Sequence, residues 1–416
     1  MPIVLPEGLS RPVREALSEC PVFDGHNDLP AKLRSEAAYS VAGLDQLTPR
    51  YHTDLVRLRQ GGVGAQFWSA WVPSQLPEPE AVVSTLEQID AIDRLAAAYP
   101  DRLARANTAA EVRTAWKAGL IASLIGIEGG HSLARSIGVL RAFARLGVRY
   151  VTLTHGTNTA WADSATDQPV HGGLSAEGEA VVREMVRIGV LVDLSHTSAQ
   201  TQRAALAVAQ APVIFSHSSA HAVTPHPRNV PDDVLRLLRQ NGGVVQVTFL
   251  PAFISPAVAA WEAEFRAGLE DFKPDFASMW PPAPLPGETV DQWLAQHGPG
   301  ARPAGGPFAR LAEWEALHPR PPVGIGDVVA HVEHLREVAG INHIGLGGDY
   351  DGTPFQPEGL EDVSGYPRLL EALADRGWSA PDLAKLAGGN VLRVLEDAEH
   401  AAEEPLWPGA PGTPRR

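Results

Sequence analysis

The sequence predicts an α/β fold, a (β/α)8 TIM barrel, and two observations carry this prediction. Short β-branched or apolar runs that end in Gly, Asp or His recur between segments with helical spacing, and there are eight of them. The main competing fold, the open doubly wound sheet, lacks its phosphate loop, because neither G-x-G-x-x-G nor G-x-x-x-x-G-K-[ST] occurs. We therefore expect eight parallel strands to close into a barrel.

The expected strands follow one another along the chain with segments of helical character between them. They are residues 21–24, 64–71, 121–127, 150–154, 190–194, 212–216, 243–249 and 343–347. One connecting helix has recognisable ends, because segment 231–243 carries Asp232 and Asp233 in its first turn and stops at glycines before the next strand.

We expect residues 1–400 to form one domain, since barrels of this class often reach about 250 residues or more as a single unit. Residues 251–326 break the strand and helix rhythm with two proline-rich segments and form a long insertion between strands 7 and 8, helical around 257–271. We interpret this insertion as a lid or a subunit contact at the active-site face. Residues 401–416 are a Pro/Gly-rich tail, which we expect to be mobile from about residue 403.

Composition and charge limit the classes of function. The chain has 416 residues, of which 44% are hydrophobic and 20% charged, as in ordinary globular proteins. Its net charge of −15 repels phosphate backbones and anionic lipid, so we expect neither nucleic acid nor a membrane as partner. The single cysteine, Cys20, excludes an intrachain disulfide and a thiolate zinc cage. The sequence shows neither a leader-like start nor an apolar run of about 18 residues, which favours a cytoplasmic protein.

Polar residues that are unusual for a core follow the carboxyl ends of the expected strands, where barrel enzymes place their active sites. They are His26, Asp28, Glu128, His155, His196, His217 and Asp349. A single histidine after a strand is more often structural, so the argument depends on their joint placement. Imidazoles and carboxylates without cysteine suit zinc or a similar divalent ion in an open catalytic site, and the two oxygens of Glu128 could bridge two ions.

The H-x-D pair has two interpretations. In extended backbone, His26 and Asp28 point to the same side and can reach one ion, but Asn27 and Asp28 could equally cap a helix. Two other hydrolase signatures, H-E-x-x-H and G-x-S-x-G, do not occur, which argues against a helical zinc protease and a serine hydrolase.

The remaining histidines are weaker candidates. His131 and His221 are candidates to support the rim of the barrel from outside the ligand set. His331 and His334 stand three apart on an expected helix, and we assign them to a solvated helix face.

Seven ordered blocks of the chain resemble the renal or membrane dipeptidase family, zinc dipeptidases of peptidase family M19 in the amidohydrolase superfamily. The resemblance covers about residues 24–393. The blocks are 24–30 (DGHNDLP), 126–132 (GIEGGHS), 153–158 (LTHGTN) with 161–163 (WAD), 213–219 (VIFSHSS), 228–233 (RNVPDD), 347–352 (GGDYDG) and 357–364 (PEGLEDVS).

The resemblance implies a barrel of the metal-dependent hydrolase type and a role for each residue of the cluster. It implies two Zn²⁺ per chain with ligands His26, Asp28, Glu128 as the bridge, His196 and His217. It further implies that His155 contacts substrate during catalysis, that Arg228 meets the substrate carboxylate, and that Asp349 is the catalytic acid and base. Without the resemblance, Arg228 could instead form a helix cap or a salt bridge near Asp232 and Asp233.

The activity implied is a metallo-dipeptidase that hydrolyses dipeptides, including those with a C-terminal D-residue, through a hydroxide bridging the two ions. The partner is then a dipeptide substrate, and family habit together with the single cysteine implies a non-covalent homodimer. The first alternative is another amidohydrolase reaction, either hydrolysis of a cyclic amide or lactone or a deamination. The second alternative is a non-catalytic metal-binding barrel.

Overall fold

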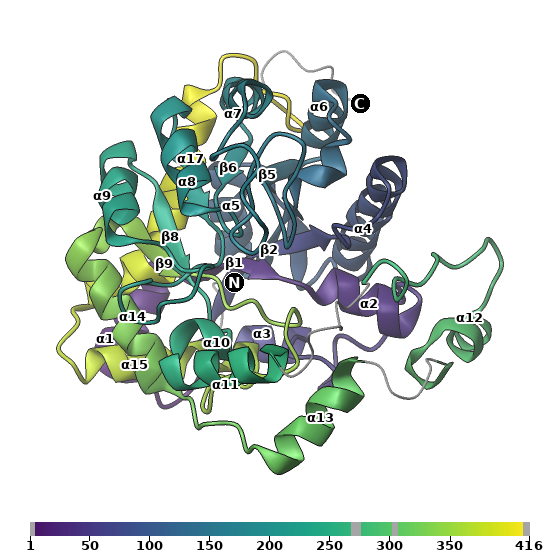
Figure 1. The fold of residues 1–416 in the computed structure, drawn as a ribbon. Helices are drawn as coiled ribbons and strands as arrows, with labels where there is room; N and C mark the ends of the chain where they lie inside the picture. Colours follow the sequence, from purple (N-terminus) through teal and green to yellow (C-terminus); the bar gives the residue numbers. More distant parts are fainter. Residues whose placement is uncertain (1–4, 268–275, 302–306, 411–416) are drawn as a thin grey trace.

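Eight parallel strands close into a barrel with helices around it, as the sequence predicts (Figure 1). The structure is a computed structural model that describes residues 5–267, 276–301 and 307–410. Strand order around the barrel is β2-β1-β9-β8-β7-β6-β5-β4, and β2 pairs with β4 to close it. The barrel strands are β1 (Val22–Asn27), β2 (Val63–Trp71), β4 (Ile121–Glu128), β5 (Val148–Thr152), β6 (Leu191–Asp193), β7 (Ile214–Phe215), β8 (Val244–Val247) and β9 (Ile344–Leu346).

A short extra strand, β3 (Leu103–Arg105), is absent from the sequence prediction. It pairs with the first residues of β4, where Leu103 lies opposite Ile121. The later residues of β4 pair with β5 instead. Three residues are too few to show a strand pattern in the sequence.

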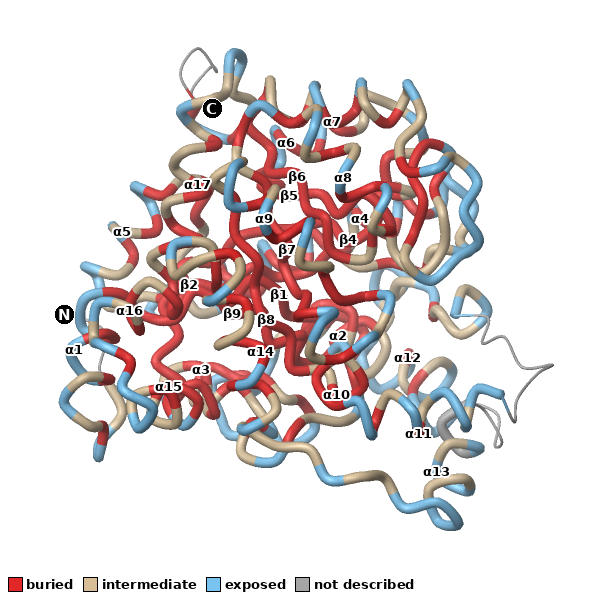
Figure 2. The backbone as a smooth tube through the Cα atoms, turned by 60° about the vertical axis from the view of Figure 1, so that its left-hand side comes forward, coloured by how far each residue is buried: buried red, intermediate tan, exposed pale blue. Residues whose placement is uncertain are grey.

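The strands are buried along nearly their whole length, as expected of a parallel barrel covered by helices (Figure 2). Inside the barrel, the Phe23 and Phe67 rings stack with centroids 5.3 Å apart, and Phe67 packs against Tyr150 at 4.9 Å. All three rings are fully buried, and each contributes about 2 to 3 kcal/mol of apolar burial. They help to fill the interior of the barrel with side chains.

The covering helices begin and end on chemistry that the sequence contains. Helix α9 begins with Asp232 and Asp233 in its first turn and ends at Gly242 in a left-handed conformation, which confirms the prediction for 231–243. The helices around the barrel are α1 (Arg11–Glu19), α2 (Leu29–Ala37), α3 (Leu55–Gln60), α4 (Glu78–Ala98), α5 (Ala109–Ala118), α6 (Ile137–Arg145), α7 (Ala176–Ile188), α8 (Ala199–Val208), α9 (Asp232–Asn241), α14 (Ile325–Val338), α15 (Tyr366–Ala374), α16 (Ala380–Ala384) and α17 (Asn390–Ala401).

The long insertion lies between β8 and β9, the seventh and eighth strands of the barrel. It contains α10 (Pro251–Ile254), α11 (Pro256–Ala267), α12 (Val290–His297) and α13 (Pro307–Leu317). The helix expected at 257–271 corresponds to α11, and residues 268–275 lie outside the described part of the chain. Helix α12 packs beside α2, so the insertion reaches across to the first helix after β1 (Figure 1).

The C-terminal tail contacts the body of the protein between residues 403 and 410, which argues against the mobility expected from its composition. The Trp407 side chain is buried, and the guanidinium of Arg149 lies 4.4 Å from the centre of its ring. The backbone N–H of Glu404 donates to Arg187 O over 2.9 Å. Composition predicted mobility because proline and glycine dominate the segment, but one buried tryptophan anchors it. Residues 411–416 lie outside the described chain.

Among the helices that the structure describes, none is both long and apolar enough to cross a lipid bilayer.

Candidate metal centre

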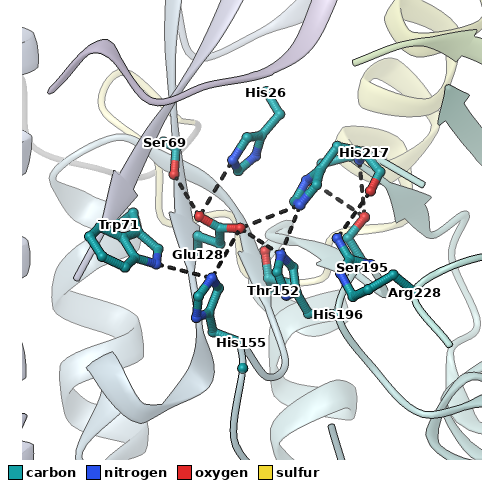
Figure 3. A network of polar contacts seen from close by, with 12 residues as sticks. His26, Ser69, Trp71, Glu128, Thr152, His155, Ser195, His196, His217 and Arg228 are labelled. Atoms are coloured by element: carbon teal, nitrogen blue, oxygen red, sulfur yellow. Dashed lines mark hydrogen bonds and ion pairs between the residues drawn. The ribbon is translucent and has the colours of Figure 1, made fainter. Parts of the chain in front are cut away.

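The structure brings every sequence-predicted site residue to one rim of the barrel. Their side chains come from the carboxyl ends of six strands. Figure 3 shows six of them together, namely His26, Glu128, His155, His196, His217 and Arg228. Three overlapping groups have possible ligand atoms within 4.8 Å of one another. These groups are His26 with Glu128 and His217, Glu128 with His155 and His196, and His26 with Asp28 and Asp349.

Glu128 is the centre of this cluster, and its two carboxylate oxygens face different partners. Oε2 lies 3.4 Å from His26 Nε2. Oε1 lies 2.8 Å from His196 Nε2 and 3.4 Å from His217 Nε2. A carboxylate with one oxygen facing His26 and the other facing His196 and His217 has the geometry to bridge two ions.

The imidazole of His217 has its free lone pair on the nitrogen that faces Glu128. Its Nδ1 lies 2.9 Å from the hydroxyl of Ser216, and that hydroxyl donates its proton to Asp193 Oδ2 over 2.6 Å. The hydroxyl can therefore only accept from His217, which places the ring proton on Nδ1. Burial lowers the pKa of His217 well below its usual value, so the ring is neutral and Nε2 is an acceptor.

His26 occupies a position that favours positive charge. Its Nδ1 lies 3.0 Å from the hydroxyl of Tyr150, and its buried Nε2 has no hydrogen-bond partner among the described residues. Burial alone would lower the pKa of His26, but the facing side chains of Tyr150, Glu128 and Asp28 raise it well above its usual value. A cation between His26, Asp28 and Glu128 would meet the same demand.

Asp28 stands at the N-cap position of α2, yet its carboxylate does not cap the helix. Asn27 Oδ1 accepts from the Leu29 N–H instead, over 3.0 Å. Asp28 Oδ2 lies 3.3 Å from His26 Nε2, and within the described residues its buried Oδ1 has no hydrogen-bond partner. Both interpretations of the H-x-D pair are thus partly right, because the residue starts a helix while its side chain faces the cluster.

Asp349 lies beside Asp28 at a crowded point of the rim. A Cβ on Gly352 would lie 2.3 Å from Asp349 Oδ1 and 2.4 Å from Asp28 Oδ2, so only glycine lets the loop pass here. Burial raises the pKa of the Asp349 carboxyl well above its usual value. The backbone is left-handed at His196, Asp349 and Asp351, with φ of 65°, 57° and 66°. Such strain in non-glycine residues, about 1 to 3 kcal/mol each, is typical of functional sites.

Arg228 is a buried cation that has no carboxylate partner among the residues that the structure describes. Its side chain donates to Ser218 Oγ over 3.4 Å and to the His217 carbonyl over 3.3 Å, and Nε has no partner in the described chain. The alternative of a salt bridge near the start of α9 does not occur, because Asp232 pairs with His334 and Asp233 with Arg203. Two long hydrogen bonds to neutral groups leave a positive charge available to an anion.

His155 lies beside this cluster and has a partner that sequence reasoning missed. Its Nε2 lies 3.9 Å from Glu128 Oε1 and accepts the indole N–H of Trp71 over 3.1 Å (Figure 3). Because an indole N–H can only donate, the proton of a neutral His155 is on Nδ1. Trp71 ends the second predicted strand, and its pairing with Glu128 across β2 and β4 sets the contact. Tyr150 and Ser216 were missed as well, since Tyr150 lies inside β5 and Ser216 directly follows β7, and nothing in the local pattern marks either residue.

The other histidines divide differently from the prediction. His131 is largely buried, and a Cβ on Gly129 would touch both its ring and the Cβ of His155, so it lies behind that residue. His221 is exposed, which corrects its assignment as a support of the rim. His331 is fully buried and hydrogen-bonds to Ala220 N at 3.0 Å, so its assignment to a solvated face is wrong.

The correction extends in part to His334, which is half-buried and lies 2.8 Å from Asp232 Oδ1. The spacing of the two histidines placed them on one helix face, but spacing alone cannot show that α14 packs this face against α9 and α10.

A closed parallel barrel with imidazoles and carboxylates gathered at the carboxyl ends of its strands is the arrangement of a metal-dependent barrel enzyme. The sequence profile of the membrane dipeptidase family, peptidase family M19, matches residues 10–408. The dipeptidase verJ of Clonostachys rogersoniana is 39% identical over 411 residues, which cover 96% of this chain and 89% of the relative.

Solved structures share the fold. The probable dipeptidase PvdM from Pseudomonas aeruginosa superposes with a TM-score of 0.76 at 23% identity, over 94% of this chain and 98% of that one. A metallo peptidase from Rhodobacter sphaeroides, liganded with a phosphinate mimic of the dipeptide L-Ala-D-Ala, has a TM-score of 0.70 at 24% identity, over 91% and 99% of the two chains. The chain therefore belongs to the membrane dipeptidase family and is a metallo-dipeptidase. This assignment favours dipeptide hydrolysis over the other amidohydrolase reactions and over a non-catalytic barrel.

Proposed function

We propose that this enzyme hydrolyses dipeptides at a centre of two zinc ions, and that it accepts a D-residue at the C-terminal position of the substrate. The observation that carries the proposal is the two-sided environment of Glu128, whose Oε2 faces His26 while Oε1 faces His196 and His217. His26 and Asp28 would hold one ion, His196 and His217 the other, and Glu128 would bridge them.

The donor set fits zinc. It consists of imidazole nitrogens and carboxylate oxygens, and the only cysteine of the chain, Cys20, lies outside all three candidate groups. The hydroxyls of Tyr150 and Ser216 hold the far nitrogens of His26 and His217, as partners of metal-bound histidines commonly do. Bound divalent ions would supply a water that ionises near neutral pH and would polarise the scissile carbonyl.

Asp349 is the proton carrier in this proposal. Its carboxylate belongs to the same close group as His26 and Asp28, so a water attacking the peptide bond there lies within its reach. Asp349 accepts a proton from that water and delivers it to the nitrogen of the leaving residue. The backbone at Asp349 is left-handed, a strained conformation that is typical of functional sites.

His155 and Arg228 act on the substrate. The Trp71 indole fixes the ring of His155 beside Glu128, where the imidazole would contact the oxygen of the peptide carbonyl, which gains negative charge as the carbon becomes tetrahedral. Arg228 binds the C-terminal carboxylate with its guanidinium, whose Nε has no partner in the described chain. This selects substrates that end one residue beyond the scissile bond.

Acceptance of a C-terminal D-residue has a separate basis. The relative from Rhodobacter sphaeroides, which shares the fold, is liganded with a mimic of L-Ala-D-Ala. In our proposal the guanidinium of Arg228 holds the carboxylate, a group common to both stereoisomers, so anchoring does not depend on which side of the Cα carries the side chain.

Metal analysis combined with a stereochemically complete dipeptide library tests these statements together. We expect about two zinc ions per chain and turnover of both L-L and L-D dipeptides, with no turnover of D-L dipeptides. A stoichiometry of one ion per chain contradicts the bridging role of Glu128, and exclusive use of L-L substrates contradicts the stereochemical statement.

We also propose that the enzyme is a non-covalent homodimer. Cys20 is buried and its thiol has a pKa raised by burial to about 12, so it is poorly placed for a disulfide between subunits. Light scattering on the purified enzyme should give the mass of a dimer with and without reductant. A monomer mass in both conditions contradicts the proposal.

A further inference from the structure

Two tryptophans form an apolar surface beside the candidate metal centre. Trp71 at the end of β2 donates its N–H to His155, and Trp280 from the insertion packs edge-on against it with ring centroids 5.3 Å apart. Both side chains are partly exposed. The polar edge of Trp71 is used by His155, and the indole N–H of Trp280 is buried without a partner among the described residues, so the exposed part of the pair offers a ligand the hydrocarbon of two large rings.

This surface lies across the barrel from Arg228. In the strand order, β2 is separated from β7 by four steps in each direction, through β1, β9 and β8 on one side and through β4, β5 and β6 on the other. Trp71 ends β2, whereas Arg228 follows β7 and donates to the carbonyl of His217. The rings of His155 and His196 lie between them, at centroid distances of 4.4 Å from each other and 4.9 Å from His196 to His217 (Figure 3).

The direction of a bound dipeptide follows from this arrangement, on the basis of the proposed function. If the C-terminal carboxylate is on Arg228, the scissile amide lies about one residue, or roughly 3.5 Å, further into the site. In the proposal the amide then lies at the cluster around Glu128. The N-terminal residue then extends beyond the cluster, toward β2, and its side chain meets Trp71 and Trp280.

The surface is held in place before substrate arrives. The buried Arg34 lies over the Trp280 ring, with its guanidinium carbon 4.6 Å from the ring centre. Its Nε donates to Pro281 O over 2.9 Å, and its Nη1 bonds to the Tyr39 hydroxyl and pairs with Glu87. Helices α2 and α4 therefore fix the insertion at the point where Trp280 faces the site, which lowers the entropic cost of binding against it.

We propose that Trp71 and Trp280 form the subsite for the N-terminal residue of the substrate, and that the enzyme prefers dipeptides whose N-terminal side chain is large and apolar or aromatic. Trp280 is then a specificity-determining residue that the insertion contributes to the barrel. Its ring would lie against the substrate side chain without taking part in proton transfer.

The test compares kcat/KM of wild type and Trp280→Ala on Phe-Ala, Gly-Ala and Ala-Phe. We expect wild type to prefer Phe-Ala to Gly-Ala, and the substitution to lower kcat/KM for Phe-Ala at least tenfold more than for the other two substrates, since loss of apolar contact acts on the larger side chain. The matched control is Trp261→Ala in the same insertion. Trp261 packs against Arg320 and donates to His318 O, and its loss should leave the three ratios unchanged.

An equal loss on all three substrates, a selective loss on Ala-Phe, or the same selective loss in the Trp261 control overturns the subsite. Trp280→Leu keeps apolar bulk and should give an intermediate ratio of kcat/KM for Phe-Ala to kcat/KM for the other two substrates. This variant replaces Trp280→Ala if the alanine variant does not fold. Failure of the proposed function is recognised separately with Arg228→Met. If that variant hydrolyses all three dipeptides as well as wild type does, the carboxylate anchor is wrong, whatever Trp280→Ala shows.

Discussion

Replacement of Arg228 by methionine should separate substrate recognition from folding. Within the described parts of the chain the guanidinium makes only two hydrogen bonds, of 3.3 and 3.4 Å, both to uncharged groups. Loss of such bonds costs about 1 kcal/mol or less each, and methionine keeps the apolar stem that packs in the site. We therefore expect the free energy of unfolding to change by no more than about 2 kcal/mol.

The effect of Arg228→Met on kcat/KM for dipeptides should be much larger than its effect on stability. Truncation of one partner in a buried charged contact costs about 2 to 5 kcal/mol, which corresponds to a loss of roughly thirtyfold to several thousandfold in kcat/KM. A dipeptide amide, whose C-terminus is neutral, should lose less than about tenfold, because it has no carboxylate for Arg228 to bind.

The assay is the steady-state hydrolysis of Ala-Ala and of its C-terminal amide by wild type, Arg228→Met and Arg203→Met. Arg203 pairs with Asp233 on the surface at 2.7 Å and is the matched control, for which we expect wild-type activity. An equal loss on the acid and the amide would refute the reasoning, since it would mean that Arg228 supports the site without meeting the carboxylate.

Four further substitutions test other parts of the account. Asp349→Asn should keep metal content near that of wild type and lower kcat by about a hundredfold or more, and wild-type kcat would exclude Asp349 as the proton carrier. Tyr150→Phe removes the hydroxyl beside His26 Nδ1 and should weaken metal binding about 10- to 100-fold in a chelator competition; unchanged binding would show that the hydroxyl does not orient the ring. On acidification from about pH 6.5 to 4, His331→Gln should lose less of its free energy of unfolding than wild type does. Burial lowers the pKa of His331 to about 4, so the unfolded chain binds a proton at this residue before the folded chain does, and wild type loses up to about 3 kcal/mol of its free energy of unfolding as the pH falls through this window. Urea titrations that give wild type and variant the same dependence on pH would contradict this. Trp407→Ala should lower stability by about 3 to 5 kcal/mol in the same assay with kcat unchanged, whereas unchanged stability would return the tail to the mobile state that its composition predicts.

The site was predictable from sequence because a parallel barrel gathers the carboxyl ends of its strands. Glu128 and His217 are far apart in sequence, yet a strand before each is enough to place both on one rim. The supporting groups were not predictable in this way. Tyr150 reaches His26 across the inside of the barrel, and Trp71 reaches His155 because its register with Glu128 places it there. Such contacts depend on strand register and on the width of the barrel, which local patterns do not contain.

The fold was predictable to the level of the eight strands, and the errors have physical causes. Strand β3 is three residues long and depends on β4 for its hydrogen bonds. The tail was judged by its proline and glycine content, but Trp407 finds a partner in Arg149 on the distant strand β5. His331 was assigned to a solvated face because helical spacing shows which residues share a face, but not which face packs inward.

The central claim is that Glu128 lies between two metal ions, and anomalous diffraction at the zinc absorption edge from crystals of the zinc-loaded enzyme tests it most directly. The account predicts two peaks about 3.5 to 4 Å apart, one beside each oxygen of the Glu128 carboxylate. A single peak, or two peaks of which neither contacts Glu128, would contradict it.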